Sequence, residues 1–108
     1  MATPTLLNAS SNRKFGDAFT YKAAYTGAGA KETILTPAGR SVSIHLTGTF
    51  NVDVETTLSS QADIEAGTAT FIVANSAVAT AGVLHLAHCQ AFRIKVNTGD
   101  PTLQVYAS

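Results

Sequence analysis

Between Ser41 and Leu58 the chain alternates apolar and polar residues with a period of two. The apolar residues occupy even positions and are Val42, Ile44, Leu46, Phe50, Val52 and Val54. Successive side chains of a β-strand point to opposite faces of a sheet, so this period predicts strands with one buried face. Gly48 interrupts the series and predicts a turn that folds the run into two antiparallel strands while the same residues stay inside. We therefore expect an all-β protein.

Further strands are expected after residue 18. The candidate segments are 19–26, 32–36, 68–74, 82–87, 91–96 and a closing strand in which Leu103, Val105 and Ala107 face inward. The apolar run Phe71-Ile72-Val73 is typical of a strand buried on both sides or at a sheet centre. About eight short strands at this spacing indicate a sandwich or barrel, and a jelly roll with two four-stranded sheets fits the count.

The connections between these strands follow from turn-forming residues. Segment 27–30 is glycine-rich and predicts a flexible connector, 59–63 predicts a polar connection, and 97–101 predicts a strong turn. Segment 75–82 is rich in alanine and predicts a loop or a short turn of helix. No amphipathic helix is expected.

The first 18 residues differ from the remainder. They contain turn-forming residues, namely Pro4, Asn8, Ser10, Ser11, Asn12 and Gly16, and few periodic apolar positions. This predicts an extended N-terminal arm over 1–18, ordered by partners, ahead of a single β-sandwich domain over 19–108. A domain of this size can bury about two thirds of its unfolded surface, so we expect no cofactor, metal or disulfide to be needed for folding.

The charge content is low. Charged residues make up 13% of the chain, against roughly 25% in typical soluble domains. A surface with so little charge favours contact with other protein, although a threonine-rich surface that is merely soluble stays open. The net charge is zero, which argues against a nucleic-acid partner. Residues 1–40 are mildly basic, which suits an acidic neighbour.

The N-terminal residues and the longest apolar stretches indicate where the protein is made and whether it spans a membrane. The N-terminal residues lack the basic region and apolar core of a secretory signal, and no stretch approaches the roughly 20 apolar residues of a membrane span. Cys89 is the only cysteine, so no intramolecular disulfide is possible. We expect synthesis in a host cytoplasm and no membrane partner.

Two groups of residues are candidates for a metal or for catalysis. His85, His88 and Cys89 include good zinc ligands, but on a strand His85 and Cys89 share one face while His88 points to the other. The carboxylates Asp53, Glu55, Asp63 and Glu65 suit calcium or an acid and base pair, against a solvated strand face. Since no nucleophile is placed beside a base, we expect no catalytic residue and no enzyme activity.

Two further patterns concern ligands. Segment 27–31 resembles a phosphate loop, but the required G-x-x-x-x-G-K followed by Ser or Thr is absent. Tyr21, Tyr25 and Tyr106 lie near the first and last strands and suit either a sugar-stacking surface or interface packing. Tyr106 is expected to point outward, opposite to Val105.

The order of elements from residue 41 onward resembles small β-sandwich proteins of tailed-bacteriophage virions. The resemblance rests on Ser41-Val42-Ser43-Ile44, Thr47-Gly48-Thr49-Phe50, Val52, Val54, Thr57-Leu58-Ser59-Ser60, Ala91-Phe92-Arg93-Ile94-Lys95-Val96 and Leu103-Gln104-Val105. It is a hydrophobic pattern covering 41–108. Many such proteins have an Asp-Gly pair and a tryptophan after the second strand, and Gln61-Ala62-Asp63-Ile64 here has neither.

This resemblance implies a head decoration (cement) protein on the capsid surface of a virion. It implies a homotrimer that clamps neighbouring subunits of the major capsid protein and stabilises the assembled shell by mass action. The residues expected to bind the capsid lie in the arm and are Leu6, Leu7, Arg13, Lys14 and Phe15, with the leucines as anchors and the basic pair facing acidic capsid surface. The alternatives are a tail or head-to-tail connector component, and a carbohydrate-binding attachment module.

Overall fold

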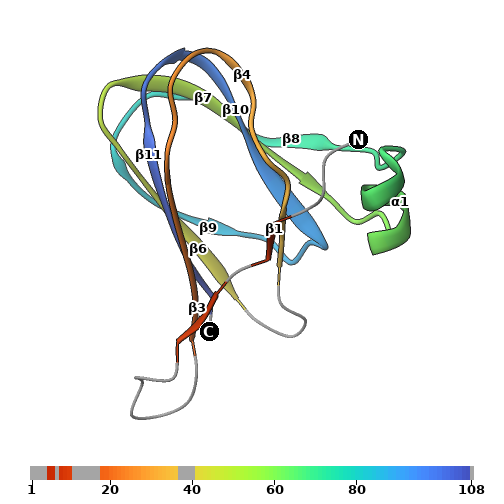
Figure 1. Ribbon diagram of the computed structural model, residues 1–108. Helices are drawn as coiled ribbons and strands as arrows, with labels where there is room; N and C mark the ends of the chain where they lie inside the picture. The colour runs from red at the N-terminus through yellow and green to blue at the C-terminus, as the bar shows by residue number, and fades with distance from the viewer. Residues whose placement is uncertain (1–4, 7, 11–17, 37–40, 108) are drawn as a thin grey trace.

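The protein is a sandwich of two β-sheets. The computed structural model describes residues 5–6, 8–10, 18–36 and 41–107, with only the backbone described for 5, 6, 8–10 and 18. In Figure 1 the two sheets face each other and the short helix α1 lies to one side of them. The expected all-β sandwich is confirmed.

The first sheet has six strands. Its order is β1 (Thr5–Leu6), β5 (Ile34–Leu35), β10 (Ala91–Gly99), β7 (Phe50–Thr57) and β8 (Ile72–Val78), and β4 (Gly29–Ala30) also pairs with β10. The second sheet has five strands, in the order β2 (Asn8–Ser10), β3 (Ala18–Ala24), β11 (Thr102–Ala107), β6 (Val42–Thr47) and β9 (Gly82–Leu86). Neighbouring strands are antiparallel except for β1 and β5.

Eight of these strands form a jelly roll. Without the short strands β1, β2 and β4, the sheets read β5-β10-β7-β8 and β3-β11-β6-β9. The first of the eight strands then pairs with the last, and the second pairs with the seventh. Such pairing makes the strands wind as a double Greek key, which is the jelly-roll arrangement. The expected pair of four-stranded sheets is therefore present, and three short strands add to it.

The core lies between the two sheets. The alternating residues expected to face inward are all buried, with exposed fractions of 5% or less: Val42, Ile44, Leu46, Phe50, Val52, Val54, Phe92, Ile94, Val96, Leu103, Val105 and Ala107. Gly48 has φ of 101° in the turn between β6 and β7, a conformation that glycine adopts at little cost. The period-two pattern thus predicted both the strands and their buried faces.

The described parts of the first 18 residues pair with both sheets. β1 lies parallel to β5 in the six-stranded sheet, and β2 lies antiparallel to β3 in the five-stranded sheet. The backbone there is extended, as expected of an arm, and it is hydrogen-bonded to sheet edges. Ordering of the arm by a partner stays a prediction.

A short helix occupies the segment expected to be a polar connection. In α1 (Gln61–Ala66) the Ser60 side chain accepts a hydrogen bond from the Asp63 N–H, and Gly67 ends the helix with φ of 78°. Ile64 is its buried residue. The described part of the chain contains no helix with the length and hydropathy needed to cross a membrane.

The strand at 68–74 is misplaced in the sequence prediction. β8 runs over Ile72–Val78 at the edge of its sheet, next to β7, so 75–78 is strand rather than loop. Ile72 is 68% exposed and Val73 is 45% exposed, which contradicts burial at a sheet centre. An apolar run shows that residues can be buried, but only the strand order decides whether a second neighbour covers them.

Candidate functional site

The arm residues expected to bind a partner are only partly within the described structure. Leu6 is the second residue of β1, and its Cα pairs with that of Leu35 in β5. Leu7, Arg13, Lys14 and Phe15 lie outside the described residues. Their proposed role in partner binding stays a prediction.

The histidine and cysteine group does not form a cluster. His85 is exposed on β9, where its Nδ1 lies 2.8 Å from the Ser43 Oγ. Cys89 packs against the core, and its carbonyl accepts a hydrogen bond from the Thr36 hydroxyl. Burial raises the pKa of the Cys89 thiol, an effect that the Thr36 hydroxyl partly offsets. Within the described ranges, no three His, Cys, Asp or Glu side chains are close enough to share a metal.

The four carboxylates do not converge on one site. Glu55 pairs with Arg93, with Oε1 2.5 Å from Nε, and the Arg93 guanidinium stacks 3.9 Å from the centroid of the Phe71 ring. Asp63 lies in α1 with Glu65. Asp53 accepts hydrogen bonds from the Ala77 N–H at 2.8 Å and from the Asn97 amide at 3.2 Å. The contacts of Asp53 and Glu55 hold side chains in place on the outer face of the six-stranded sheet. They do not bring the four carboxylates together.

We predict that Asp53 makes the stability of this sheet depend on pH. The Ala77 N–H holds the pKa of Asp53 below its ordinary value. Lost hydration is the next largest effect and opposes this shift, while the Asn97 amide and the Lys95 charge add smaller lowering effects. A lowered pKa contributes stability above the ordinary value of about 3.9, and this contribution is lost as the pH falls through the folded-state pKa. Asp53→Asn should therefore be less stable than the wild type at neutral pH, and the difference should shrink below about pH 4.

Urea unfolding at several pH values measures this difference, and Asn97→Ala is the comparison. That variant leaves the larger Ala77 contribution in place, so its loss should be smaller than that of Asp53→Asn. Ala77 has φ of 52°, which alanine rarely adopts, and the bond to Asp53 holds it there. A pH-independent loss in Asp53→Asn would contradict the assignment.

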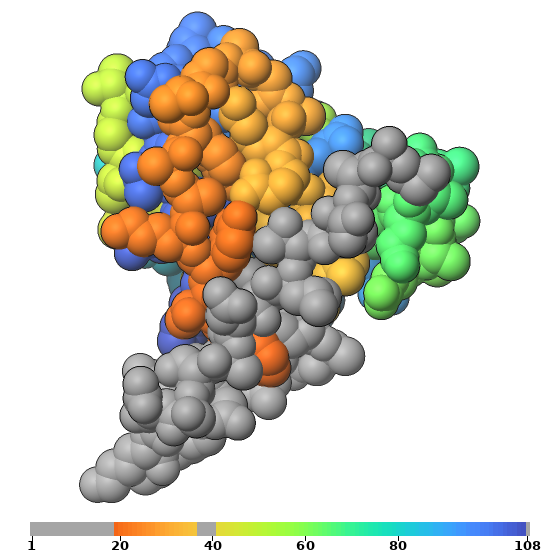
Figure 2. All heavy atoms as spheres, in the orientation of Figure 1, coloured from red at the N-terminus to blue at the C-terminus, as the bar shows by residue number. Residues whose placement is uncertain are grey.

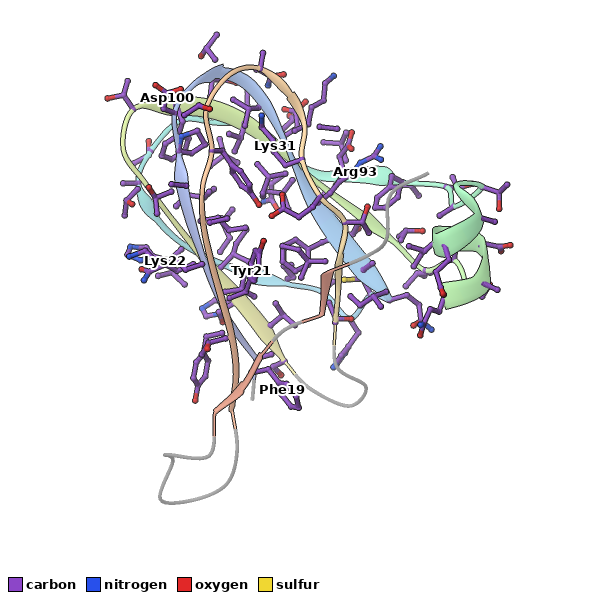
Figure 3. The ribbon with its side chains drawn as sticks, viewed as in Figure 1. Phe19, Tyr21, Lys22, Lys31, Arg93 and Asp100 are labelled. Carbon is purple, nitrogen blue, oxygen red and sulfur yellow. The ribbon has the colours of Figure 1, made fainter. Side chains whose placement is uncertain are left out.

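The three tyrosines do not share a surface, so they do not form the joint sugar-stacking surface that the sequence left open beside interface packing. Tyr25 is 7% exposed and belongs to the core, where burial and the nearby Glu32 carboxylate raise its pKa. Tyr21 packs against the core from β3, and its hydroxyl donates to Glu32 Oε2 at 2.5 Å. In Figure 3, Phe19 and Tyr21 point between the sheets while Lys22 points outward. Tyr106 alternates with the buried Val105 and lies on the outer face, as expected.

The two edge strands on one side of the sandwich contain no Asp, Glu, Lys or Arg. From Ala66 to Phe92 the sequence contains no Asp, Glu, Lys or Arg. This run includes β8 and β9, which are the edge strands of the two sheets on the same side. Edge strands usually carry charge, because an unpaired edge otherwise accepts a strand from another molecule. We call β8, β9 and the adjacent Leu58 the uncharged side.

The uncharged side contains a hollow where the two edge strands separate. β8 begins beside α1 (Figure 1), and Ala87 and His88 directly follow the end of β9. The hollow has a volume of about 540 Å³ and its lining residues are Thr56, Thr57, Leu58, Ser59, Thr70, Ile72, Ala87 and His88. In Figure 2 residues 61–70 form a lobe that projects from the sandwich next to this region. We call this feature the corner hollow.

Two large apolar side chains of the corner hollow, Leu58 and Ile72, are not covered. Thr56 pairs with the buried Phe92 on one side and with Ile72 on the other, so Ile72 has the inward parity of the core. Nevertheless Ile72 is 68% exposed and Leu58 is 78% exposed. The core therefore continues to an open corner that another molecule can complete.

The absence of Asp, Glu, Lys and Arg from residues 66–92 is visible in the sequence, but the prediction of strands made no use of it. All four exposed large hydrophobic residues of the described chain, Leu58, Ile72, Val73 and Val83, lie on the uncharged side.

Comparison with family models, curated proteins and solved structures finds no match for this chain. Its function is therefore argued from its own surfaces.

Proposed function

We propose that the protein is a non-enzymatic virion structural protein that decorates an assembled phage head. Its partner is the major capsid protein, and it acts as a homotrimer on the capsid surface. The observation that carries this proposal is the uncharged side, in which two edge strands without Asp, Glu, Lys or Arg lie on one side of the sandwich and Leu58 and Ile72 are exposed in the corner hollow. Protein interfaces are depleted of charge at their centre in the same way.

The energetics of the corner hollow favour docking. Covering a Leu or Ile side chain yields about 1.5–3 kcal/mol, and both Leu58 and Ile72 remain uncovered. The edge of β8 also offers backbone donors and acceptors to an extended segment of a partner. A ligand that binds only the assembled shell stabilises that shell by mass action. Such a contact therefore needs no covalent or catalytic step.

The fold and the arm support the same proposal. Jelly rolls serve as capsid domains and as lectins, which is an argument by analogy of fold. β1 and β2 hold parts of the arm against the edges of the two sheets. We place Leu6, Leu7, Arg13, Lys14 and Phe15 at a second contact, where the leucines anchor the arm and the cations face acidic capsid surface.

Ile72→Lys tests the docking contact. A lysine in the corner hollow would have to lose its hydration on binding without gaining a partner, so we expect affinity for expanded capsids to fall at least about tenfold. Cosedimentation of purified protein with capsids measures this change.

Two matched variants separate docking from folding and from net charge. Ile72→Val keeps an apolar residue in the hollow and should bind nearly as the wild type does. Thr98→Lys adds the same charge at an exposed position of β10 and should also bind normally. Unchanged binding by a folded Ile72→Lys protein would overturn the proposed contact, and equal losses in Thr98→Lys would assign the effect to charge alone.

A further inference from the structure

The outer face of the five-stranded sheet carries an ordered array of polar side chains. Strand register places four residues in one row across β3, β11, β6 and β9: Thr20, Tyr106, Ser43 and His85. The next row contains Lys22, Gln104, His45 and Val83. Adjacent strands are about 4.8 Å apart, so the array spans about 14 Å. We call these eight residues the outer-face array.

A hollow of about 360 Å³ lies in the middle of this array. Its lining includes Thr20, Ser43, His45, Gln104 and Tyr106. Hydrogen bonds hold two pairs of these polar side chains across neighbouring strands. The His45 Nδ1 lies 3.3 Å from the Gln104 Oε1, and the Ser43 Oγ lies 2.8 Å from the His85 Nδ1. Each imidazole also has a second nitrogen, and the Gln104 amide has its NH2 group, so the array presents further hydrogen-bonding atoms in fixed places.

The charge on this array has one sign. Lys22 is exposed at one end of the second row and is the only Lys or Arg among the eight residues. None of the eight residues is acidic. The acidic residues whose side chains are described lie in other segments: Glu32, Asp53, Glu55, Asp63, Glu65 and Asp100. The array is therefore complementary to a negatively charged ligand.

We infer that the outer-face array binds an acidic saccharide. The ring of Tyr106 offers an aromatic surface for one face of a sugar ring, and Ser43, His45 and Gln104 supply donors and acceptors for its hydroxyls. Lys22 faces the carboxylate of the sugar. This binding goes beyond the proposed decoration of a phage head. It uses the outer face of the five-stranded sheet, shares only His85 and Val83 of β9 with the uncharged side, and does not involve the corner hollow.

Titration of the ¹⁵N-labelled protein with sugars tests this inference. The probes are N-acetylneuraminic acid and glucuronic acid, with glucose and galactose as neutral counterparts. We expect saturable shifts in the amide signals of residues 20–22, 43–45 and 104–106 with the acidic sugars at up to about 10 mM, which corresponds to millimolar affinity. The neutral sugars should bind at least about tenfold more weakly, because they lack the charge-assisted contact.

Variants distinguish this site from general attraction of anions. Lys22→Gln and Gln104→Ala should each weaken binding by about threefold to tenfold or more. Lys95→Gln removes an exposed lysine from β10 in the other sheet and should leave binding unchanged. The spectrum of each variant reports whether the fold is retained.

Three results would overturn the inference. They are the absence of saturable shifts with both acidic sugars, equal affinity for acidic and neutral sugars, and equal weakening by Lys95→Gln. Acidic peptides that bind the array when the sugars do not would assign it to a protein partner instead. None of these results bears on capsid binding, which is measured separately.

Discussion

Replacement of Phe92 by alanine is expected to lower the free energy of unfolding by about 3–5 kcal/mol. Phe92 is 0% exposed and lies in β10, between Ile34 of β5 and Thr56 of β7. Removing its ring leaves a cavity in the core between the two sheets, and neighbouring strands cannot collapse into it without losing their register. The loss is a large share of the roughly 5–15 kcal/mol that stabilises a typical domain. Urea unfolding followed by circular dichroism measures it.

Phe71→Ala is the matched control for Phe92→Ala. Phe71 is partly exposed and packs on the Arg93 guanidinium, so we expect its removal to cost only about 1 kcal/mol. Both substitutions remove the same ring, and they differ in burial. Equal losses in the two variants would contradict the placement of the core between the sheets.

The second large effect is expected for Gly99→Ala, at about 2–5 kcal/mol of lost stability. Gly99 has φ of 88°, and a Cβ added there would lie 2.2 Å from the Thr49 carbonyl oxygen and 2.6 Å from the Phe50 Cα. Both neighbours are backbone atoms, so the end of β10 must move away from the start of β7. That movement also disturbs the hydrogen bond from the Asp100 N–H to the Thr49 carbonyl. Thermal and urea unfolding measure the loss.

Gly27→Ala separates steric overlap from backbone strain. Gly27 has φ of 80°, close to that of Gly99, but an added Cβ would meet no atom within 4 Å. Alanine at residue 27 is therefore strained only by the left-handed backbone conformation, which should lower the free energy of unfolding by about 1 kcal/mol. If both variants lost the same stability, the close approach at Gly99 would be refuted.

The sequence was sufficient to predict the fold class and most of the core. Side chains in a strand alternate strictly, so Ile44, Val54 and Ile94 could be assigned to the inside without knowledge of the strand order. The order itself could not be predicted. Pairings such as β3 with β11 join residues far apart in the chain, and nothing local in the sequence records them.

The sequence prediction was wrong where the local residue pattern of a segment disagrees with the position of that segment in the fold. Phe71-Ile72-Val73 has the composition of a central strand, but β8 lies at a sheet edge. The helix α1 is six residues long, which is too short to show a helical period. Its capping residues, Ser60 and Gly67, were the available signals.

The candidate site could be predicted only in outline. Low total charge predicted contact with other protein, but the concentration of uncharged residues between Ala66 and Phe92 became meaningful once both edge strands were seen on one side. Ile72 pairs with Thr56 and has inward parity, so pattern alone assigns it to the core. Its exposure depends on the position of β8 at the edge of the sheet, which is a tertiary feature.

The most direct test of capsid decoration is native mass spectrometry of the purified full chain, alone and after incubation with expanded phage capsids. Decoration predicts a homotrimer that transfers onto the capsids and leaves the unbound fraction. Rings of another symmetry that bind phage tails or connectors would favour that alternative place in the virion. A stable monomer that stays unbound in the presence of capsids would contradict the proposed function.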